Sequence, residues 1–366
     1  MRFPGFQEYE QSLLLLDHGR NPFRGDANRV IPNPKLEPGR IAMHDAVGQF
    51  AIVYKIRSNG KLWALRCPKA GFPGNVRERC RRVSETLPKS SPRYLLETVF
   101  AEPGMFVGGR EVPVMLMEWV DGENLRDRVE SLCRTKDQQG LQDLAYRFRA
   151  LCAAMDKDQF SHGDLSHGNI LVRHDGSIVL VDYDTVYRVG DSGGRRTITG
   201  TPGYAHPNPS ESLMQEGPDM DVLPRLIIRL ALDCYAAQPQ LFGRYSNETL
   251  MLDNDDLLQP LHSARLSEVR QVVPSVASTI NEITSALARW DGATRQPWSA
   301  SPTRMVQPPP VPSEPVPITY QPGDAVQPSK LQPPPKTPYA PGNSNIGSTS
   351  LIGPQKPAYN PGDSLK

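Results

Sequence analysis

Cysteine and long hydrophobic runs are both scarce in this chain, and each shortage excludes a class of protein. The five cysteines are odd in number and scattered, with no CxxC pair and no Cys/His cluster, which argues against a disulfide scaffold and a zinc site. We expect reduced thiols in a core. No apolar run approaches the roughly 18 residues that a membrane-spanning helix needs. The N-terminus has only a four-leucine run near acidic residues, unlike a signal peptide. These absences predict a soluble, cytoplasmic protein without a membrane partner.

An excess of charge of either sign is also lacking. The chain has 41 Lys and Arg residues against 40 Asp and Glu residues, which gives a formal net charge of +1. Proteins that bind nucleic acid through its phosphates usually have a strongly basic composition or basic clusters. We therefore expect no nucleic-acid partner.

Proline, in contrast, is abundant and unevenly distributed. Of the 37 prolines, 17 lie in residues 301–366, in runs such as PPPVP and PPPKTP. This composition cannot bury enough apolar surface to fold, so residues 293–366 are predicted to be a disordered tail. A Tyr-x-Pro-Gly pattern recurs at Tyr320, Tyr339 and Tyr359. The repeats are either a multivalent ligand for the groove of a partner protein or an inert spacer.

The candidate catalytic and metal-binding residues lie in one stretch, HGDLSHGNILVRHDGSIVLVDYD, which runs from His162 to Asp184. Asp164 and Asn169 lie on a loop, and two short apolar runs follow, joined by a segment with the Asp-Gly signal of a tight turn. A hairpin here would return Asp182 to the side of Asn169. Carboxylate and amide oxygens of this kind suit Mg²⁺, which shares its remaining coordination with water and substrate phosphates.

This stretch resembles the catalytic loop and metal-binding segment of protein kinases. Downstream, Gly200-Thr201-Pro202-Gly203-Tyr204 is similar to the end of a Ser/Thr kinase activation segment. The resemblance implies an α+β, two-lobed protein-kinase-like fold and the cofactors ATP and Mg²⁺. It implies that Asp164 accepts the proton of the substrate hydroxyl, while Asn169 and Asp182 hold the metal.

The resemblance also divides the chain into parts. It implies an N-terminal extension at 1–40, a small β-rich N-lobe at 41–120, a helical C-lobe at 121–292 and the Pro-rich tail at 293–366. In the C-lobe, helical patterns cover Leu141 to Met155, the stretch after Pro218 to about Ala237, and the segments 254–262 and 266–290. This is less chain than a full kinase C-lobe has, so its distal part is expected to be reduced.

Residues 50–56 and 62–67 alternate like paired strands around Ser58-Asn59-Gly60, which predicts a hairpin. By resemblance, the segment 46–53 takes the place of the Gly-rich loop, although only Gly48 keeps a glycine, and a plain hairpin turn is the alternative. Arg66 stands where the family has lysine. The resemblance implies that Gly48, Val53, Ala64 and Arg66 contact the nucleotide; a solvated strand residue is the other interpretation of Arg66.

Residues 74–88 have a helical apolar face and take the place of the kinase αC helix. Glu78 and Glu85 are both possible acidic partners of Arg66, or both belong to a solvated surface. Strands are predicted at 93–102 and 111–120. By resemblance, Met117 is the gatekeeper, and the Glu118 carbonyl and the Val120 backbone contact adenine.

Two departures from the kinase pattern change the expected mechanism. Gly163 replaces the arginine before the catalytic aspartate, so activity should not depend on phosphorylation of Thr197 or Thr199. Asp184 replaces a glycine and is either a further metal ligand or a repulsive charge. Asp221 matches an aspartate that anchors the catalytic loop, or it is a simple helix N-cap.

These features support three functions. The first is an atypical bacterial-type Ser/Thr protein kinase acting on protein substrates. The second is a pseudokinase or scaffold that binds nucleotide and recruits partners through its tail. The third is a small-molecule phosphotransferase, because HGDLxxGNIL also occurs in aminoglycoside and choline kinase relatives; the segment from Gly200 to Tyr204 argues against it.

Overall fold

A computed structural model describes residues 3–14, 27–30, 43–47, 51–58, 60–69, 74–86, 94–188, 194–196, 200–209 and 214–290. Met1–Ala300 and Ser301–Lys366 form separate units. The predictions about the tail and its Tyr-x-Pro-Gly repeats therefore concern residues outside the described part, as do those for Gly48, Thr197 and Thr199.

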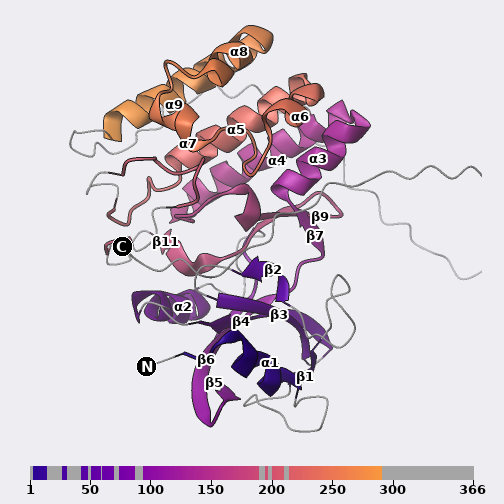
Figure 1. The fold of residues 1–366 in the computed structure, drawn as a ribbon, viewed down its shortest axis with the longest axis vertical. Helices are drawn as coiled ribbons and strands as arrows, with labels where there is room; N and C mark the ends of the chain where they lie inside the picture. Colours follow the sequence, from indigo (N-terminus) through magenta and orange to yellow (C-terminus); the bar gives the residue numbers. More distant parts are fainter. Residues whose placement is uncertain are drawn as a thin grey trace, which may run out of the picture. The chain divides into compact units, whose positions relative to one another are not determined.

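An antiparallel sheet dominates the N-terminal region of the first unit (Figure 1). Its strand order is β1-β3-β4-β6-β5, with β2 also paired to β3. The strands are β1 (Ala27–Val30), β2 (Met43–Val47), β3 (Ala51–Ser58), β4 (Lys61–Pro68), β5 (Thr98–Val107) and β6 (Arg110–Glu118).

The predicted hairpin is confirmed, because β3 and β4 pair from Ala51 opposite Pro68 to Ser58 opposite Lys61. One boundary differs clearly from expectation. β5 begins at Thr98, since Tyr94 and Leu95 form a turn instead of extending the strand, and β1 lies within the N-terminal extension at 1–40.

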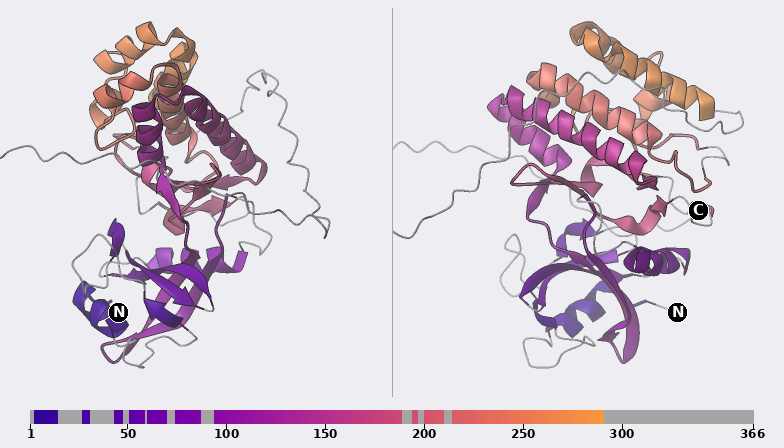
Figure 2. Two further views of the ribbon diagram at one scale, coloured as in Figure 1. Left: turned by 90° about the vertical axis from the view of Figure 1, so that its right-hand side faces the viewer. Right: turned by 180° about the vertical axis from the view of Figure 1, so that it is seen from behind.

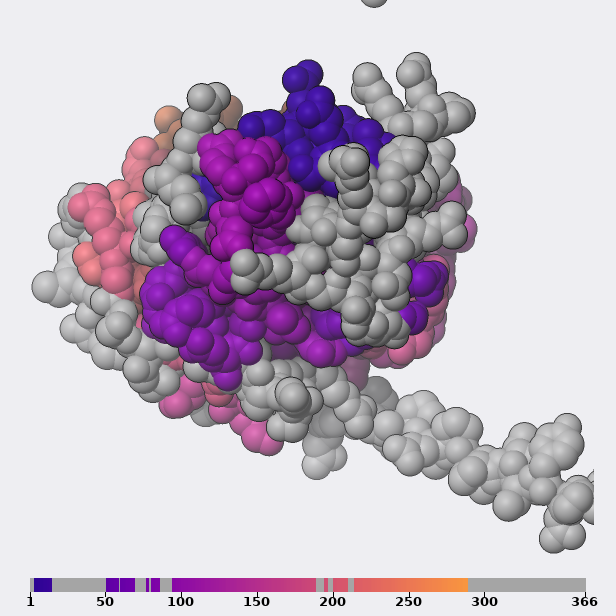
Figure 3. Space-filling model, turned by 90° about the horizontal axis from the view of Figure 1, so that it is seen from below, coloured from indigo at the N-terminus to yellow at the C-terminus, as the bar shows by residue number. Residues whose placement is uncertain are grey.

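Two helices belong to this sheet region, α1 (Phe6–Leu14) and α2 (Gly74–Thr86). Tyr9 and Leu13 of α1 are fully buried against apolar side chains of β3 to β6, and the Tyr9 hydroxyl donates to the Pro68 carbonyl at 2.6 Å. Figure 3 views this region from below and shows α1 in indigo at its surface. The helix α1 thus covers one face of the sheet.

The C-terminal part of the first unit is mainly helical (Figures 1 and 2). Its helices are α3 (Leu125–Thr135), α4 (Gln138–Lys157), α5 (Val222–Ala237), α6 (Phe242–Tyr245), α7 (Asn254–Leu258), α8 (Ala264–Val272) and α9 (Ala277–Trp290). Figure 2 shows α5 between α4 and α9. Most side chains of α5 are buried, because an apolar helix needs neighbours on several sides.

The segment 266–290 was expected to be one amphipathic unit, and this prediction is wrong. Two helices, α8 and α9, cover it, separated by a short turn at Pro274–Val276. Proline has no backbone N–H to continue a helix and disfavours helical geometry in the residue before it. Val273 accordingly lies outside the helical region, with φ −129° and ψ 74°.

Small strands frame the stretch from His162 to Asp184. β7 (Gly122–Asn124), β9 (Ile170–Arg173) and β10 (Ile178–Leu180) form one sheet, and β8 (Phe160–Ser161) pairs with β11 (Tyr187–Arg188). The turn between β9 and β10 has the predicted form: Gly176 adopts φ +79° and its N–H donates to the Arg173 carbonyl at 2.8 Å.

The cysteines are free thiols: Cys67, Cys80, Cys133 and Cys234 are buried and Cys152 is half-buried, in agreement with reduced core residues. Over the described ranges, every helix is too short or too polar to cross a lipid bilayer.

Candidate active site

Asp221 anchors the loop that carries Asp164. Its fully buried carboxylate accepts hydrogen bonds from the backbone N–H groups of His162 and Gly163, the latter at 2.8 Å. Asp221 occupies the N-cap position of α5 but makes no side-chain capping bond there. Of the two interpretations of this residue, the loop anchor is therefore confirmed.

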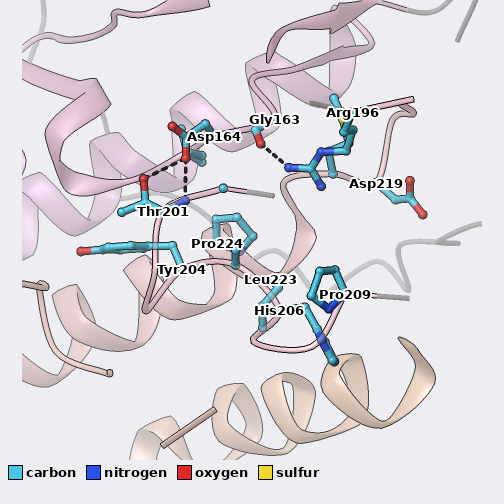
Figure 4. Close-up of a pocket in the computed structure, with 14 residues that line it drawn as sticks. Gly163, Asp164, Arg196, Thr201, Tyr204, His206, Pro209, Asp219, Leu223 and Pro224 are labelled. Atoms are coloured by element: carbon cyan, nitrogen blue, oxygen red, sulfur yellow. Dashed lines mark hydrogen bonds between the residues drawn. The ribbon is translucent and has the colours of Figure 1, made fainter. Parts of the chain in front are cut away.

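Gly163 has a backbone that only glycine adopts without strain. Its φ is +79°, and a Cβ atom built on it would lie 2.5 Å from the Thr185 carbonyl oxygen. An arginine could not occupy this place. The arginine that contacts this position comes instead from the segment after Asp184: the Arg196 guanidinium donates a hydrogen bond to the Gly163 carbonyl (Figure 4).

A Gly163→Ala variant is expected to lose about 2–4 kcal/mol of unfolding free energy, from the left-handed backbone and the clash with Thr185 together. Gly109→Ala is the matched control, since Gly109 has φ +78° and open space around its Cα. It should lose only about 1 kcal/mol. Urea denaturation of both variants measures the difference, and equal losses would mean that the close approach at Gly163 is of no consequence.

The Asp164 carboxylate is held by donors from two different segments. Its Oδ1 accepts from both the N–H and the hydroxyl of Thr201, each at 2.8 Å (Figure 4). The Asn169 amide nitrogen donates to the Asp164 carbonyl at 2.7 Å and to Oδ2 at 3.3 Å. Thr201 was recognised only as part of the GTPGY motif, and its contact with Asp164 went unforeseen.

Asn169 and Asp182 lie side by side, as the hairpin predicted. The N–H of Val181 donates to the Asn169 carbonyl at 3.0 Å, and Asp182 is the next residue. Asp182 adopts φ +66°, an uncommon conformation for a residue other than glycine and one that is found disproportionately at functional sites.

The two side chains offer a donor set that fits Mg²⁺. The Asn169 amide nitrogen donates to Asp164, so the oxygen of that amide is the atom left for a metal. Within the described ranges, no group of three or more His, Cys, Asp or Glu side chains could hold a metal ion by itself. Mg²⁺ commonly uses one or two protein ligands together with substrate phosphates, which matches this small set.

Arg66 is buried and binds two carboxylates at once. Its Nη1 and Nη2 bind Oδ1 and Oδ2 of Asp184 at 2.9 and 2.8 Å, and Nη2 also binds Oδ1 of Asp182 at 2.8 Å. Burial alone would lower the pKa of Arg66, but the two carboxylates outweigh it and raise that pKa. The solvated-strand interpretation of Arg66 is wrong.

Neither glutamate that was considered as the partner of Arg66 contacts it. Glu78 and Glu85 both bind Arg81 on the exposed side of α2, so the solvated-surface interpretation holds for each. The hydrogen bond from Arg81 is the largest of the effects that hold the pKa of Glu78 below its usual range. On the inner side of α2, the Cys80 sulfur lies 3.8 Å from Asp184 Oδ1.

Asp184 is therefore the bidentate partner of Arg66, a role that the sequence did not suggest. Its carboxyl is almost fully buried, and burial raises its pKa against the opposing effect of the Arg66 charge. Neither of the two roles considered for it, metal ligand or repulsive charge, included this ion pair.

The residues expected around adenine lie on β3, β4 and β6. Val53 pairs with Arg66, and Ala64 pairs with the buried Met117. The Glu118 carboxylate binds Lys61 and Arg173, at 3.4 and 3.6 Å. The three strands are adjacent in the middle of the sheet, and Val120 lies just after the end of β6.

A pocket opens beside Asp164 on the side of the activation segment (Figure 4). Residues 163–165, residues 200, 201 and 204–206, and the start of α5 line it. Its walls combine apolar side chains such as Met220 and Leu223 with the polar side chains of Arg196 and Asp219. A substrate group in this pocket would lie next to the Asp164 carboxylate.

His167 links the catalytic loop to the activation segment, because its Nδ1 lies 2.7 Å from the Tyr204 hydroxyl. Burial first, and then the Arg126 charge, lower the pKa of His167. The unfolded chain then binds a proton more readily than the folded one, so stability should fall as the pH drops below about 6.5.

We expect His167→Gln to weaken this pH dependence. Between pH 7.5 and 5, the melting temperature of the wild type should fall by more than that of the variant. His262→Gln, at an exposed position, is the control. Parallel curves for wild type and His167→Gln over this range would contradict the assignment.

The sheet-rich N-terminal region and the helical C-terminal part, together with Asp164, Asn169 and Asp182, are consistent with a kinase-like fold. Comparison with family models agrees: the ABC1 atypical kinase-like domain matches residues 110–198, from β6 into the activation segment. The match confirms the resemblance to the atypical protein-kinase-like superfamily. No curated protein matches the chain.

Proposed function

We propose that this chain is an atypical, ATP-dependent Ser/Thr protein kinase that transfers the γ-phosphoryl group of ATP to hydroxyl groups of a protein substrate. The observation that carries the proposal is the double hydrogen bond from Thr201 to Asp164. It joins the proposed catalytic base to the segment that would receive the substrate.

Asp164 is the residue proposed to orient the acceptor hydroxyl and take its proton. Thr201 and Asn169 both donate to the carboxylate of Asp164 and restrict it, which favours one geometry for that proton transfer. Asn169 and Asp182 would hold Mg²⁺, and the bound Mg-ATP supplies the phosphoryl group and the charge that offsets its oxygens. Val53, Ala64, Met117, Glu118 and Val120 would contact the nucleotide base.

A protein substrate is favoured over a small molecule by the pocket beside Asp164. Part of its wall is built from residues 200–206, and a short peptide segment could lie along this wall with its hydroxyl at Asp164. The apolar side chains there, including Tyr204 and Leu223, suit an apolar residue next to the phosphorylated one.

A pseudokinase is the second candidate, and one observation favours it. Arg66 already binds Oδ1 of Asp182, so a metal ion would have to share this carboxylate with a guanidinium. In that case the chain would bind nucleotide without turnover. Its Tyr-x-Pro-Gly repeats would then recruit a partner protein with an aromatic groove. In our proposal this chain is cytoplasmic.

The test is phosphoryl transfer by the purified full chain with Mg-ATP, measured on the chain itself and on a generic protein substrate. Wild-type incorporation well above that of Asp164→Ala and Asp182→Ala supports the kinase. Incorporation no higher than theirs overturns it. Thermal stabilisation by Mg-ATP without turnover would instead identify the pseudokinase; saturation at 100 times Kd adds about 2.7 kcal/mol.

A further inference from the structure

We propose that Asp184 is the positioning residue for Arg66, and that it fixes this cation for the nucleotide phosphates without any acidic residue from α2. The inference rests on the proposed function, because it concerns how the same site holds ATP. Asp184 does not touch the substrate; it acts through Arg66.

The geometry of the pair suits this task. A guanidinium presents its two Nη groups in a planar fork, and a carboxylate that accepts from both fixes its distance and its orientation. Asp184 accepts from both Nη atoms of Arg66, at 2.9 and 2.8 Å. A lysine would offer only a point charge here, so arginine at position 66 and aspartate at position 184 form a matched pair.

The two carboxylates bound to Arg66 are not equivalent. Asp184 holds the fork with two bonds and is almost fully buried, whereas Asp182 makes a single bond to Nη2 and has a side chain that is 36% exposed. The single bond to Asp182 is the one that a phosphate can replace. Binding of Mg-ATP would then free Asp182 for the metal while Asp184 keeps Arg66 in place.

The helix α2 contributes no acid to this pair, although it lies close enough to do so. The buried Cys80 of this helix has its sulfur 3.8 Å from Oδ1 of Asp184, and the glutamates Glu78 and Glu85 bind Arg81 at the surface. The position of Arg66 is therefore set by residues that flank Tyr183 in the metal-binding segment. Phosphate handling should not depend on the acidic residues of α2.

The first test compares Asp184→Asn with Glu78→Gln and Glu85→Gln in the full chain. Asparagine keeps the size of the side chain but presents an amide N–H₂ to the guanidinium. We expect kcat/KM for ATP to fall roughly 10- to 100-fold, the loss of one charged hydrogen bond. The two glutamate variants should stay within about twofold of wild type, and an equal loss in either would overturn the proposal.

Two further measurements separate positioning from general stability. In an Arg66→Met background, Asp184→Asn should cause no further loss, because the residue acts only through Arg66. Adding Cys80→Glu to Asp184→Asn returns a carboxylate to the same place from α2 and should restore kcat/KM at least fivefold. A full additional loss in the Arg66→Met background, or no restoration by Cys80→Glu, would overturn the proposal. If Asp184→Asn does not fold, Asp184→Glu replaces it in the same comparison. An unchanged kcat/KM in Asp184→Glu would then overturn the proposal.

A binding readout keeps this test apart from the test of the proposed function. The Mg-ATP concentration for half-maximal thermal stabilisation should rise at least tenfold in Asp184→Asn, even if the wild type shows no turnover. No turnover together with this shift would end the kinase proposal and support the role of Asp184. Turnover by the wild type, together with unchanged ATP affinity and kcat/KM in Asp184→Asn, would support the kinase proposal and overturn the role of Asp184.

Discussion

An Asp164→Asn variant is expected to transfer phosphoryl groups about 10²- to 10⁴-fold more slowly than the wild type, the usual contribution of a positioned general base. The amide oxygen of asparagine can still accept from the N–H and hydroxyl of Thr201, so the loop keeps its shape. What the amide cannot do is take a proton. The loss should therefore appear in kcat, with little change in KM for ATP.

Single-turnover and steady-state assays with Mg-ATP measure this effect. Asp143→Asn, at an exposed position on α4, is the matched control and should retain wild-type kcat. The melting temperature of Asp164→Asn should stay close to that of the wild type. A kcat within threefold of wild type would show that Asp164 is not the base.

Local patterns predicted the hairpin that follows Asn169 correctly. An Asp-Gly turn between two short apolar runs is a signal contained in neighbouring residues, and it gave both the β9–β10 hairpin and the proximity of Asn169 to Asp182. The same holds for the β3–β4 hairpin. Such elements depend on contacts between near neighbours, so the sequence is sufficient for them.

The partner of Arg66 could not be predicted in this way. Arg66 and Asp184 are 118 residues apart, and their contact depends on how β4 lies against the turn at Tyr183–Thr185. Several acidic residues are equally plausible from the sequence alone. The contact between Thr201 and Asp164, 37 residues apart, was missed for the same reason.

The break at Pro274 is a different kind of miss. The apolar periodicity of residues 266–290 continues across the proline and predicts a single segment, whereas the proline itself predicts an interruption. The backbone constraint decided the outcome, since the missing N–H cannot be compensated by apolar contacts on the helix face. This signal was present in the sequence.

Asp221→Ala is expected to reduce the free energy of unfolding by about 3–5 kcal/mol. The variant removes the acceptor of two buried N–H groups, those of His162 and Gly163, and each unsatisfied group costs about 1–3 kcal/mol. It should also lower kcat, since Asp164 is the next residue along the loop. Urea denaturation and phosphoryl transfer below the melting temperature measure the two effects separately.

Asp137→Ala supplies the matched control for this loss. Asp137 is an exposed N-cap of α4 whose side chain accepts only from the Gly140 N–H, at 2.9 Å. An N-cap of this kind contributes about 1 kcal/mol. Equal losses from Asp137→Ala and Asp221→Ala would mean that Asp221 acts only as a cap. A loss several times larger at Asp221, together with a reduced kcat, follows from a carboxylate that holds the catalytic loop against α5.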